Sequence, residues 1–539
     1  MKFSKLLSIL IVLLLSHDFA FASSSIQISA KYVHIDKSKR IILINQNIDE
    51  LNSQIDCKIK ELVTSEKFTF NNPVSKLIVG DKYIVHSQDN QDYSLFITQL
   101  PIISIKCENN IVDEPKVYAE FIMIEPNGNI TKSNIGIEIR GGASVWFPKK
   151  SYKIEFWEDR NGEETKNYRL LGMRNDDDWN LQAMYNEDLR IRSKTGFELW
   201  KLIDTLEYTK YEPNAINGST QEYSELFLNG EYIGLYAVGE TVDKKQLKLD
   251  DDTGELYKGA DWGEANAFKS LPALCGNCGI WGGFEIEYPE DSNDWSRIYS
   301  FADFVVNSSK IDFDRSYFKL FDLDNSVNYF ILLNVLSAND NIGKNIFIAK
   351  QNKYGRYFYV AWDLDNIFGA DWEGNLTIPT NIILKNGFYE RLLLDNSAYG
   401  FVSKLVKRWS ELRKTVITVD RINDMLYNNY SILKYNNVFE REAMAVENYS
   451  ADTTHLDSMS IWLNQRIAFL DKEFEKLSLT IDTSIIIVPD GINIYPLPAD
   501  EYITVSINNY YGDVSIELID IMGRLAYSAL SQNCSKFNV

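Results

Sequence analysis

Apolar and polar residues alternate in short bursts over residues 25–99, and this period of two is typical of half-buried β-strands. The clearest bursts are Lys39–Ile44, Leu77–Val85 and Tyr93–Ile97. Asn, Asp and Gly residues, which favour turns, separate them. The pattern predicts a small β domain over residues 25–99.

Residues 100–300 mix strand and helix periodicities. A helix is predicted at Leu189–Leu202. The dipeptide Asn229-Gly230 favours a hairpin, because both residues tolerate positive φ. The alternating pattern predicts strands at Lys116–Ile124, Ile135–Ile139, Tyr152–Trp157, Glu222–Leu228 and Tyr232–Val238.

From Asp324 onward the apolar positions follow the helical period. Two apolar faces predict a helix that is buried on nearly every side; they consist of Val327, Phe330, Ile331, Val335, Ala338, Leu332, Leu333 and Leu336. The helix should end at Asn339-Asp340-Asn341, since short polar side chains compete with the helical backbone. Strands follow at Asn345–Lys350 and Arg356–Trp362.

Residues 396–477 are mainly helical in pattern, and the chain becomes β-like after Leu477. No internal repeat is evident. The order of elements predicts an α+β fold with a small N-terminal β domain, a large mixed domain and a C-terminal β segment.

The N-terminus has the features of a secretory signal peptide. Met1–Ala22 combines a basic start, an apolar run at Leu6–Leu15 and a small-x-small end at Ala20-Phe21-Ala22. Such a run is shorter than the roughly 20 apolar residues that a membrane span needs. We therefore expect residues 1–22 to be removed, so that a secreted or cell-surface chain begins at Ser23. The competing interpretation is a buried N-terminal strand.

Charge and cysteine content narrow the possible partners. The formal net charge of −21 makes nucleic acid and anionic membranes unfavourable partners. No other segment has the length and apolarity of a transmembrane helix. Cys275 and Cys278 form a Cys-Gly-Asn-Cys run, which suits a small-loop disulfide, a redox pair or half a metal site. Because no second close pair exists, zinc is disfavoured, and we favour a structural disulfide or free thiols.

Histidine is scarce, which excludes several kinds of active site. Only four histidines occur, and His17 lies in the signal peptide. The sequence offers no Ser-His-Asp triad, Cys-His dyad or His-rich metal site, and no Walker motif. Chemistry should therefore depend on carboxylates, Asn and Lys, a set that suits hard cations such as magnesium.

One segment contains the groups that phosphoryl transfer needs. Asp340 lies on a loop after the buried helix, Asn345 follows five positions later, and a hairpin leads to Asp363, Asp365 and Phe368-Gly369. In a kinase, one carboxylate orients the attacking hydroxyl, and an amide and a second carboxylate hold magnesium. The spacing is typical of a kinase catalytic loop and metal-binding loop. The competing interpretation is turn chemistry at helix and strand ends.

A second segment lies upstream, at Arg140–Ser144 and Pro148–Phe156. Its glycines would let backbone N–H groups approach phosphates. On a strand, Lys149, Ser151 and Lys153 point to one face, so that one lysine is placed to reach a nucleotide phosphate. The competing interpretation is a tight turn followed by a solvated strand.

Six stretches of the chain resemble, in order, blocks of the CotH (spore-coat-protein-H) kinase family over roughly residues 100–477. They are RGGASVWFPKKSYKIEF, LLGMRNDDDWNLQAMYNEDLRIRSKTGFELW, YSELFLNGEYIGLYAVGETVD, SANDNIGKNIFIAK, WDLDNIFG and SIWLNQRIAFLDKEF. The Gly-Gly-Ala of the first block departs from the more common Gly-Asn-Ser. The resemblance implies an atypical protein-kinase-like bilobal domain. It also implies ATP-dependent phosphorylation of Ser/Thr in secreted proteins, with Mg²⁺ or Mn²⁺.

The resemblance also implies roles for individual residues. Asp340 matches the catalytic Asp and Asn345 the metal-binding Asn, while Asp363 or Asp365 matches the metal-binding Asp. Three further residues complete the expected nucleotide site: Lys153 as first choice for the phosphate lysine, Lys149 as second, and Glu240 as a partner of that lysine or a support of the pocket.

The C-terminal residues 485–539 resemble the sorting domain of type IX secretion, on Ile494–Asp500, Tyr502–Val505 and Ile516–Leu525. Leu497 stands where that module usually has Asn, and the chain stops at Val539 where the module usually continues to a basic end. We expect a truncated or degenerate signal for the secretion machinery. The competing interpretation is a plain β-sandwich appendage.

These features lead to one main expectation and two alternatives. The main expectation is a secreted protein kinase of the CotH type that acts on extracytoplasmic or surface proteins. One alternative is a catalytically silent kinase-like scaffold, such as an adhesion or polysaccharide-associated surface protein. The other is a glycoside hydrolase that uses acidic pairs, whose carboxylate separation a sequence does not give.

Overall fold

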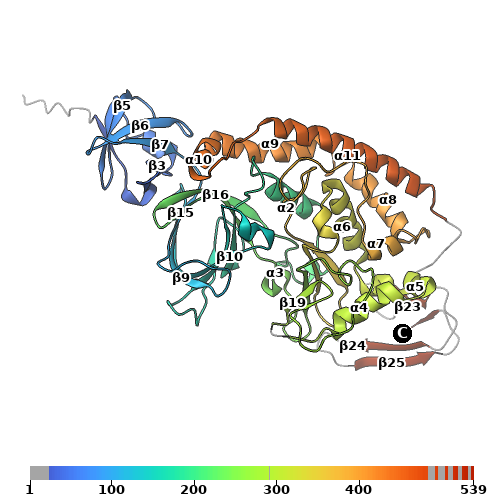
Figure 1. Ribbon diagram of the computed structural model, residues 1–539. Helices are drawn as coiled ribbons and strands as arrows, with labels where there is room; N and C mark the ends of the chain where they lie inside the picture. The colour runs from blue at the N-terminus through green and yellow to red at the C-terminus, as the bar shows by residue number, and fades with distance from the viewer. Residues whose placement is uncertain are drawn as a thin grey trace, which may run out of the picture.

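The computed structural model describes residues 24–290 and 292–482, together with five short strands between residues 492 and 538 (Figure 1). The expected signal peptide and Ser23 lie outside the described residues. The described chain contains eleven α-helices and many strands, so that the predicted α+β class is confirmed. No described helix combines the length and apolarity that crossing a membrane would require.

The N-terminal region forms a seven-stranded sheet in the order β1-β4-β5-β6-β7-β3-β2. Residues of its strands fill a separate apolar core. The other face of β3 and β7 is also buried, where Ile41, Leu43 and Phe96 pack against Ile102, Phe227 and Tyr232 of the next region. The elements are β1 (Ser25–Gln27), β2 (Val33–Asp36), β3 (Ile41–Ile44), α1 (Ile48–Asn52), β4 (Ile59–Val63), β5 (Lys67–Val74), β6 (Lys82–Ser87) and β7 (Asp92–Ile97).

The next region is a closed barrel in the strand order β10-β11-β14-β16-β15-β8-β9. The predicted hairpin joins two of its strands, and Asn229 and Gly230 both have positive φ, as expected for this dipeptide. The barrel strands are β8 (Ile102–Lys106), β9 (Val117–Ile124), β10 (Ile130–Arg140), β11 (Ser151–Trp157), β14 (Asp178–Gln182), β15 (Gln221–Leu228) and β16 (Glu231–Glu240), with β12 (Tyr168–Arg169) and β13 (Asn175–Asp176) as a separate small ribbon.

The third region is mainly helical around a five-stranded sheet in the order β18-β19-β17-β20-β21. The strands are β17 (Glu255–Gly259), β18 (Ile280–Trp281), β19 (Phe284–Tyr288), β20 (Ile346–Lys350) and β21 (Tyr357–Ala361). The helices are α2 (Arg192–Ile203), α3 (Lys244–Leu247), α4 (Ser296–Asn307), α5 (Lys310–Leu320), α6 (Leu323–Leu336), α7 (Gly387–Leu392), α8 (Phe401–Leu412), α9 (Val419–Tyr435), α10 (Val438–Ala445) and α11 (Thr454–Ser478). Figure 1 shows α9 and α11 running along one side of this region.

Helix α6 is the central element of the largest apolar core. Its residues are buried on nearly every side, as its two apolar faces predict. Asp322 caps its start by accepting from the backbone N–H groups of Asp324 and Asn325. The helix ends at Leu336, earlier than expected, because Ser337 adopts the left-handed conformation. A 3₁₀ turn at Asn339–Ile342 follows.

The chain after α11 contributes β22 (Ile492–Tyr495), β23 (Thr504–Ile507), β24 (Val514–Ile519), β25 (Leu525–Ser531) and β26 (Lys536–Asn538). The first two strands and β26 form one sheet, and β24 pairs with β25. These strands agree with the β-like pattern of the C-terminus, and the sorting interpretation stays a prediction. The structure joins Cys275 and Cys278 in a disulfide.

His34 lies where the N-terminal sheet meets the barrel. Its ring contacts Phe227 of β15, with 5.5 Å between ring centroids, and its Nδ1 lies 3.2 Å from Ser104 Oγ. Burial lowers the pKa of His34 to about 4. The imidazole therefore stays neutral in the fold at pH values where the unfolded chain, with a His pKa of about 6.5, is already protonated.

We expect this difference to weaken the fold as the pH falls from about 6.5 to about 4, because the unfolded state then binds one more proton than the folded state. The test compares the free energy of urea unfolding of the parent and of His34→Gln across that window. The gap between the two proteins should shift in favour of the variant as acid is added. A gap that stays constant between pH 7 and pH 4 would show that His34 is protonated equally in both states.

Candidate active site

Polar side chains from four distant segments line one cleft between the barrel and the helical region. The segments are the end of β10 with the loop after it, the chain between β14 and α2, the 3₁₀ turn after α6, and the loop after β21. The residues that line the cleft are Arg140, Gly141, Gly142, Ser144, Phe147, Ser151, Gln182, Asn186, Asp340, Lys344, Asn345, Asp363, Asp365, Asn366 and Trp372.

Asp340 enters the cleft from the turn that follows α6. Its Oδ2 accepts a hydrogen bond of 2.9 Å from Asn366 Nδ2. Burial raises the pKa of Asp340, and the nearby Asp363 raises it further, while Lys344 and Asn366 act in the opposite direction. Asp340 is thus a carboxylate that is held in place and easily protonated, as a general base requires.

Asn341 joins the loops that carry the other candidate residues. Its Nδ2 donates to the backbone oxygens of Asn345, at 2.7 Å, and of Trp362, at 2.6 Å. Tyr329 of α6 donates in turn to the backbone oxygen of Asn341. One buried amide therefore sets the positions of Asn345 and of the strand end before Asp363. The sequence pattern indicated only a turn residue here, since its partners lie on other segments.

Asn345 and Asp363 both adopt the left-handed conformation, with φ of 55° and 50°. Asn and Asp accept this conformation more readily than other non-glycine residues. The backbone N–H of Asn345 donates to the carbonyl of Gly259, and a Cβ at Gly259 would overlap the carbonyl of Gly343. Asn345 stands just before β20 and Asp363 just after β21, and both residues line the cleft.

Asp365 lines the cleft beside Asp363. Its Oδ2 accepts from Asn186 Nδ2 at 2.9 Å, and its backbone oxygen accepts from Arg192 Nε at 3.0 Å. Burial raises the pKa of Asp365, and the neighbouring Asp363 adds to this effect. A bound cation would offset both the cost of burying the Asp365 carboxylate and its repulsion from Asp363. The pair Asp363 and Asp365 therefore favours a cation in this part of the cleft.

The donor set fits magnesium or manganese better than a soft metal. Among the described residues, no group of three His, Cys, Asp or Glu side chains is arranged to hold a metal ion. Magnesium commonly uses one or two carboxylates and completes its shell with water and substrate phosphates. Asp363, Asp365 and Asn345 are among the residues with side-chain oxygens that line this cleft.

Two cations, Arg140 and Lys344, line the cleft together with the carboxylates. Arg140 donates to Gln182 Oε1 at 2.7 Å, and its guanidinium lies 5.3 Å from the centre of the Trp362 ring. Burial lowers the pKa of Arg140. The negative charges of Asp363 and Asp365 act in the opposite direction and raise it. Neither residue was among the predicted site residues, although both lie inside the motifs that contain those residues.

The glycine loop after β10 also reaches the cleft. Gly141 has a φ of 116°, and a Cβ there would overlap Ser144 Oγ. The turn therefore requires glycine. A Cβ at Gly142 would lie 3.9 Å from Lys344 Nζ, so this loop and the loop that carries Asp340 and Asn345 approach each other directly.

The structure does not place Lys153 or Lys149 beside the aspartates of the cleft. Lys153 Nζ lies 3.7 Å from Asp178 Oδ1, and Lys153 is absent from the described residues that line the cleft. In the strand register, Arg140 pairs with Ser151, whereas Lys153 is two positions further along β11. At about 3.3 Å per residue, this places its backbone about 7 Å from that of Ser151. Lys149 is fully buried and binds Glu442 of α10, at 2.5 Å.

Glu240 does not bind either lysine in the expected way. Its Oε1 accepts from the backbone N–H of Arg174 and its Oε2 from that of Thr220, both at 3.0 Å. The side chain lines a small recess that adjoins the cleft and that Trp362 and Asp363 also border. Glu240 therefore lies in the wall of this recess, and its support of a nucleotide pocket stays a prediction.

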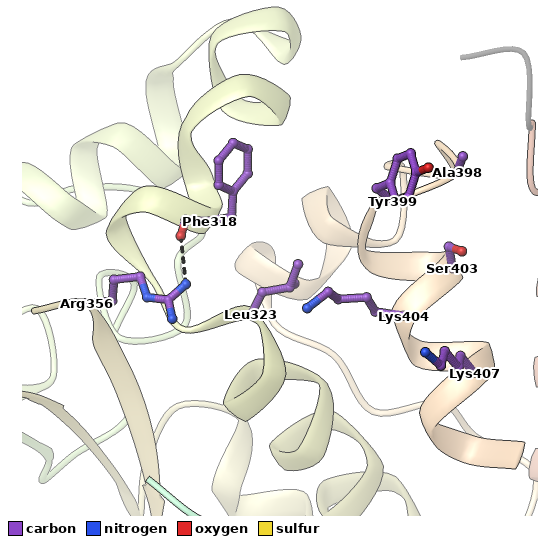
Figure 2. Close-up of a pocket in the computed structure, with 8 residues that line it drawn as sticks. All are labelled: Phe318, Leu323, Arg356, Ala398, Tyr399, Ser403, Lys404 and Lys407. Atoms are coloured by element: carbon purple, nitrogen blue, oxygen red, sulfur yellow. Dashed lines mark hydrogen bonds between the residues drawn. The ribbon is translucent and has the colours of Figure 1, made fainter. Parts of the chain in front are cut away.

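A cavity of about 550 Å³ in the helical region offers different chemistry (Figure 2). Its described lining includes Arg356, Lys404 and Lys407 and no carboxylate. Arg356 pairs with Glu207, and Lys404 lies 2.6 Å from Asp324. Much of its positive charge is already neutralised, and it lacks the oxygen ligands that a metal–nucleotide complex needs.

The family described as CotH kinase protein matches residues 137–470. This range covers more than half of the chain and includes every residue that lines the cleft. No curated protein matches the chain.

The role of Asn341 leads to a prediction about stability. Asn341→Ala should lower the free energy of unfolding by about 2–4 kcal/mol, because two buried carbonyl oxygens lose their donor. The matched control is Asn352→Ala, which removes a side chain that accepts two hydrogen bonds within an exposed turn and should cost less. Urea denaturation measures both. Equal losses in the two variants would contradict the special role of Asn341.

Proposed function

The chain belongs to the CotH kinase family, and on this basis we propose that it transfers the γ-phosphate of ATP to Ser or Thr hydroxyls of extracytoplasmic proteins. The observation that carries the proposal is the convergence of Asp340, Asn345, Asp363 and Asp365 in one cleft that Arg140 and Lys344 also line. Phosphoryl transfer relies on positioning and charge stabilisation, which these groups supply.

In the proposed reaction, the substrate hydroxyl approaches Asp340. The hydroxyl oxygen forms a bond to the γ-phosphorus while the bond from that phosphorus to the bridging oxygen of ADP breaks. The hydroxyl proton passes to the Asp340 carboxylate, which Asn366 holds in orientation. Arg140 and Lys344 balance the negative charge of the phosphates, including that which develops on the leaving ADP oxygen.

Asn345, Asp363 and Asp365 are the residues that would hold Mg²⁺ or Mn²⁺. A bound ion supplies positive charge that neutralises phosphate oxygens. The crowding of the carboxylates around Asp363 supports this role, since it is costly until a cation binds. Both Asp363 and Asp365 line the cleft, so the two candidates for the metal Asp act as a pair in this proposal.

The proposal assigns the two sides of the cleft to the two lobes of a kinase-like domain. The barrel from β8 to β16 takes the place of the N-terminal lobe, and the helical region around α6 takes the place of the C-terminal lobe. Residues 1–22 would direct export to a secreted or surface location, and residues 485–539 would address the secretion machinery. The N-terminal sequence motif and the β-like C-terminal pattern support these two assignments.

A catalytically silent scaffold is the second candidate. The observation that favours it is the placement of Lys149 and Lys153, since Lys149 is committed to Glu442 and Lys153 lies beside Asp178. A scaffold of this kind would keep the fold and the cleft but would not transfer phosphate. Incubation of the purified chain with labelled ATP and magnesium distinguishes the two, because only the kinase labels itself or a protein substrate.

We expect Asp340 and the metal ligands to differ in what their loss removes. Asp340→Asn keeps the shape of the side chain and should still bind Mg·ATP, but it should lose transfer by about 10²–10⁴-fold. Asp363→Ala and Asp365→Ala should instead weaken metal-dependent ATP binding. Glu373→Gln, which changes an exposed carboxylate near the cleft, is the control. If Asp340→Asn transfers phosphate as fast as the parent, Asp340 is not the base.

The identity of the phosphate-binding cation is tested by thermal shift. Mg·ATP should stabilise the parent by about 2.7 kcal/mol at a hundredfold excess over Kd. We expect Arg140→Gln and Lys344→Gln to reduce this stabilisation, because their side chains line the cleft. Lys153→Ala should retain it. If Lys153→Ala loses the shift and the other two variants keep it, the strand lysine has the role that the family resemblance implies.

A further inference from the structure

Helix α10 contacts the barrel although it follows the catalytic segments by many residues in the chain. Figure 1 shows it beside β16, at the end of α9. Arg441 and Glu442, two neighbours on this helix, are completely buried. Both form ion pairs with distant segments of the chain. Arg441 pairs with Glu225, and Glu442 pairs with both Lys149 and Arg190.

Glu442 uses both of its oxygens. Oε1 accepts from Lys149 Nζ at 2.5 Å and from Arg190 Nη2 at 3.0 Å and Nε at 3.2 Å. Oε2 accepts from the backbone N–H of Leu235 at 2.8 Å. A Cβ at Gly234 would overlap Oε2, so β16 admits this carboxylate only because a glycine stands there. Burial by itself would raise the pKa of Glu442, but Lys149 and Arg190 hold it below its ordinary value.

Lys149 connects Glu442 to the first wall of the cleft. It follows the loop that contains Gly141, Gly142, Ser144 and Phe147, all of which line the cleft. Besides Glu442, Lys149 Nζ binds the carbonyl of Leu235 at 2.5 Å. The loop is therefore tied to β16 and α10 at its C-terminal end.

Arg190 connects the same carboxylate to the second wall. Its Nη1 donates to the backbone oxygens of Met184, Tyr185 and Glu187, so that the turn curls around the guanidinium. This turn carries Asn186, whose side chain binds Asp365 Oδ2. The rings of Tyr185 and Phe147 lie 5.1 Å apart, so the two walls also contact each other.

We propose that Glu442 is a positioning residue for the active site: by binding Lys149 and Arg190 together, it holds the glycine loop and the Asn186 turn at the distance that the reaction requires. The inference rests on the proposed kinase function for its effect on catalysis. Glu442 itself touches neither the cleft nor any reacting group, and it acts through its two basic partners.

The neighbouring ion pair offers a matched control. Arg441 Nε donates to Glu225 Oε2 at 3.2 Å, and both side chains are completely buried. Glu225 also accepts from Tyr232 and from Thr98, which belong to the barrel and to the chain between the first two domains. Glu225 has the same charge and burial as Glu442 and also joins α10 to the barrel, through Arg441, but it forms no hydrogen bond or ion pair with either wall of the cleft.

The experiment compares Glu442→Gln with Glu225→Gln in the purified full chain. Both variants should lose stability, because each leaves a buried arginine without its carboxylate. Well below both melting temperatures, Glu442→Gln should lower kcat by about tenfold to a hundredfold, since small misplacements of catalytic groups have effects of this size. Glu225→Gln should stay within about twofold of the parent. A folded Glu442→Gln with parental kcat and KM would overturn the inference.

Lys149→Met provides a second variant in case Glu442→Gln does not fold. This variant leaves Glu442 and Arg190 as a buried ion pair whose charges cancel. It should also lower kcat, because the glycine loop loses its attachment to Glu442. A folded Lys149→Met with parental kcat would count against the inference.

Hydrogen exchange gives a readout that does not depend on activity. Glu442→Gln should speed the exchange of backbone amides in residues 141–147 and 184–190. Lys149→Met should speed exchange in residues 141–147. Glu225→Gln should leave the exchange of both segments unchanged. Unchanged protection of both segments in Glu442→Gln would overturn the anchoring itself. If the parent transfers no phosphate but exchange changes as expected, the proposed function fails while the anchoring stands.

Discussion

The candidate active site depends on one constraint: buried backbone carbonyls outside regular secondary structure must find donors. To present Asp340, Asn345 and Asp363, the chain leaves α6, β20 and β21 and so frees carbonyls that no helix or sheet satisfies. The side chains of Asn341 and Arg192 supply these donors, and Arg190 does the same for the turn between β14 and α2. Hydrogen bonds from buried side chains therefore hold the conformation of the cleft loops, as backbone hydrogen bonds hold that of the helices around them.

The same loops concentrate negative charge that the fold by itself does not balance. Burial and mutual repulsion raise the pKa of Asp340 and of Asp365. Arg140 and Lys344 line the same cleft, and no ion pair of the described residues joins them to these groups. An arrangement of this kind is costly when empty and favourable when a cation and an anionic phosphate chain enter together. This charge pattern is the basis of the proposal that the cleft binds a metal–nucleotide complex.

The barrel and the helical region are joined by ion pairs between side chains as well as by apolar contacts. Replacing a buried ion pair by apolar residues often leaves stability unchanged or increases it, so such pairs are weak evidence of stabilisation. At α10 the pairs specify geometry, because Glu442 meets a lysine, an arginine and a backbone N–H at once. A helix from the C-terminal part of the chain thereby determines where loops of the N-terminal part lie.

What the sequence by itself determined about this protein is what short-range physics controls. Two apolar faces made α6 a buried helix, Asn229-Gly230 made a hairpin because both residues accept positive φ, and the ordered motifs identified the family that the match over residues 137–470 shows. Asp340, Asn345 and the two loop aspartates could be grouped as one site, since a single run of chain carries them. The bilobal arrangement and the roles of these residues remain proposals.

Only the tertiary structure decided which long-range partner each polar side chain binds. Strand alternation placed Lys149 and Lys153 on one face, but it gave no sign that Lys149 would pair with Glu442, 293 positions further along the chain. Likewise, Asn341 looked like a turn residue, and Glu240 binds backbone N–H groups in place of a lysine. The physical reason is that a buried charge must be compensated by whatever group the fold brings within hydrogen-bond distance, and local sequence does not contain that information.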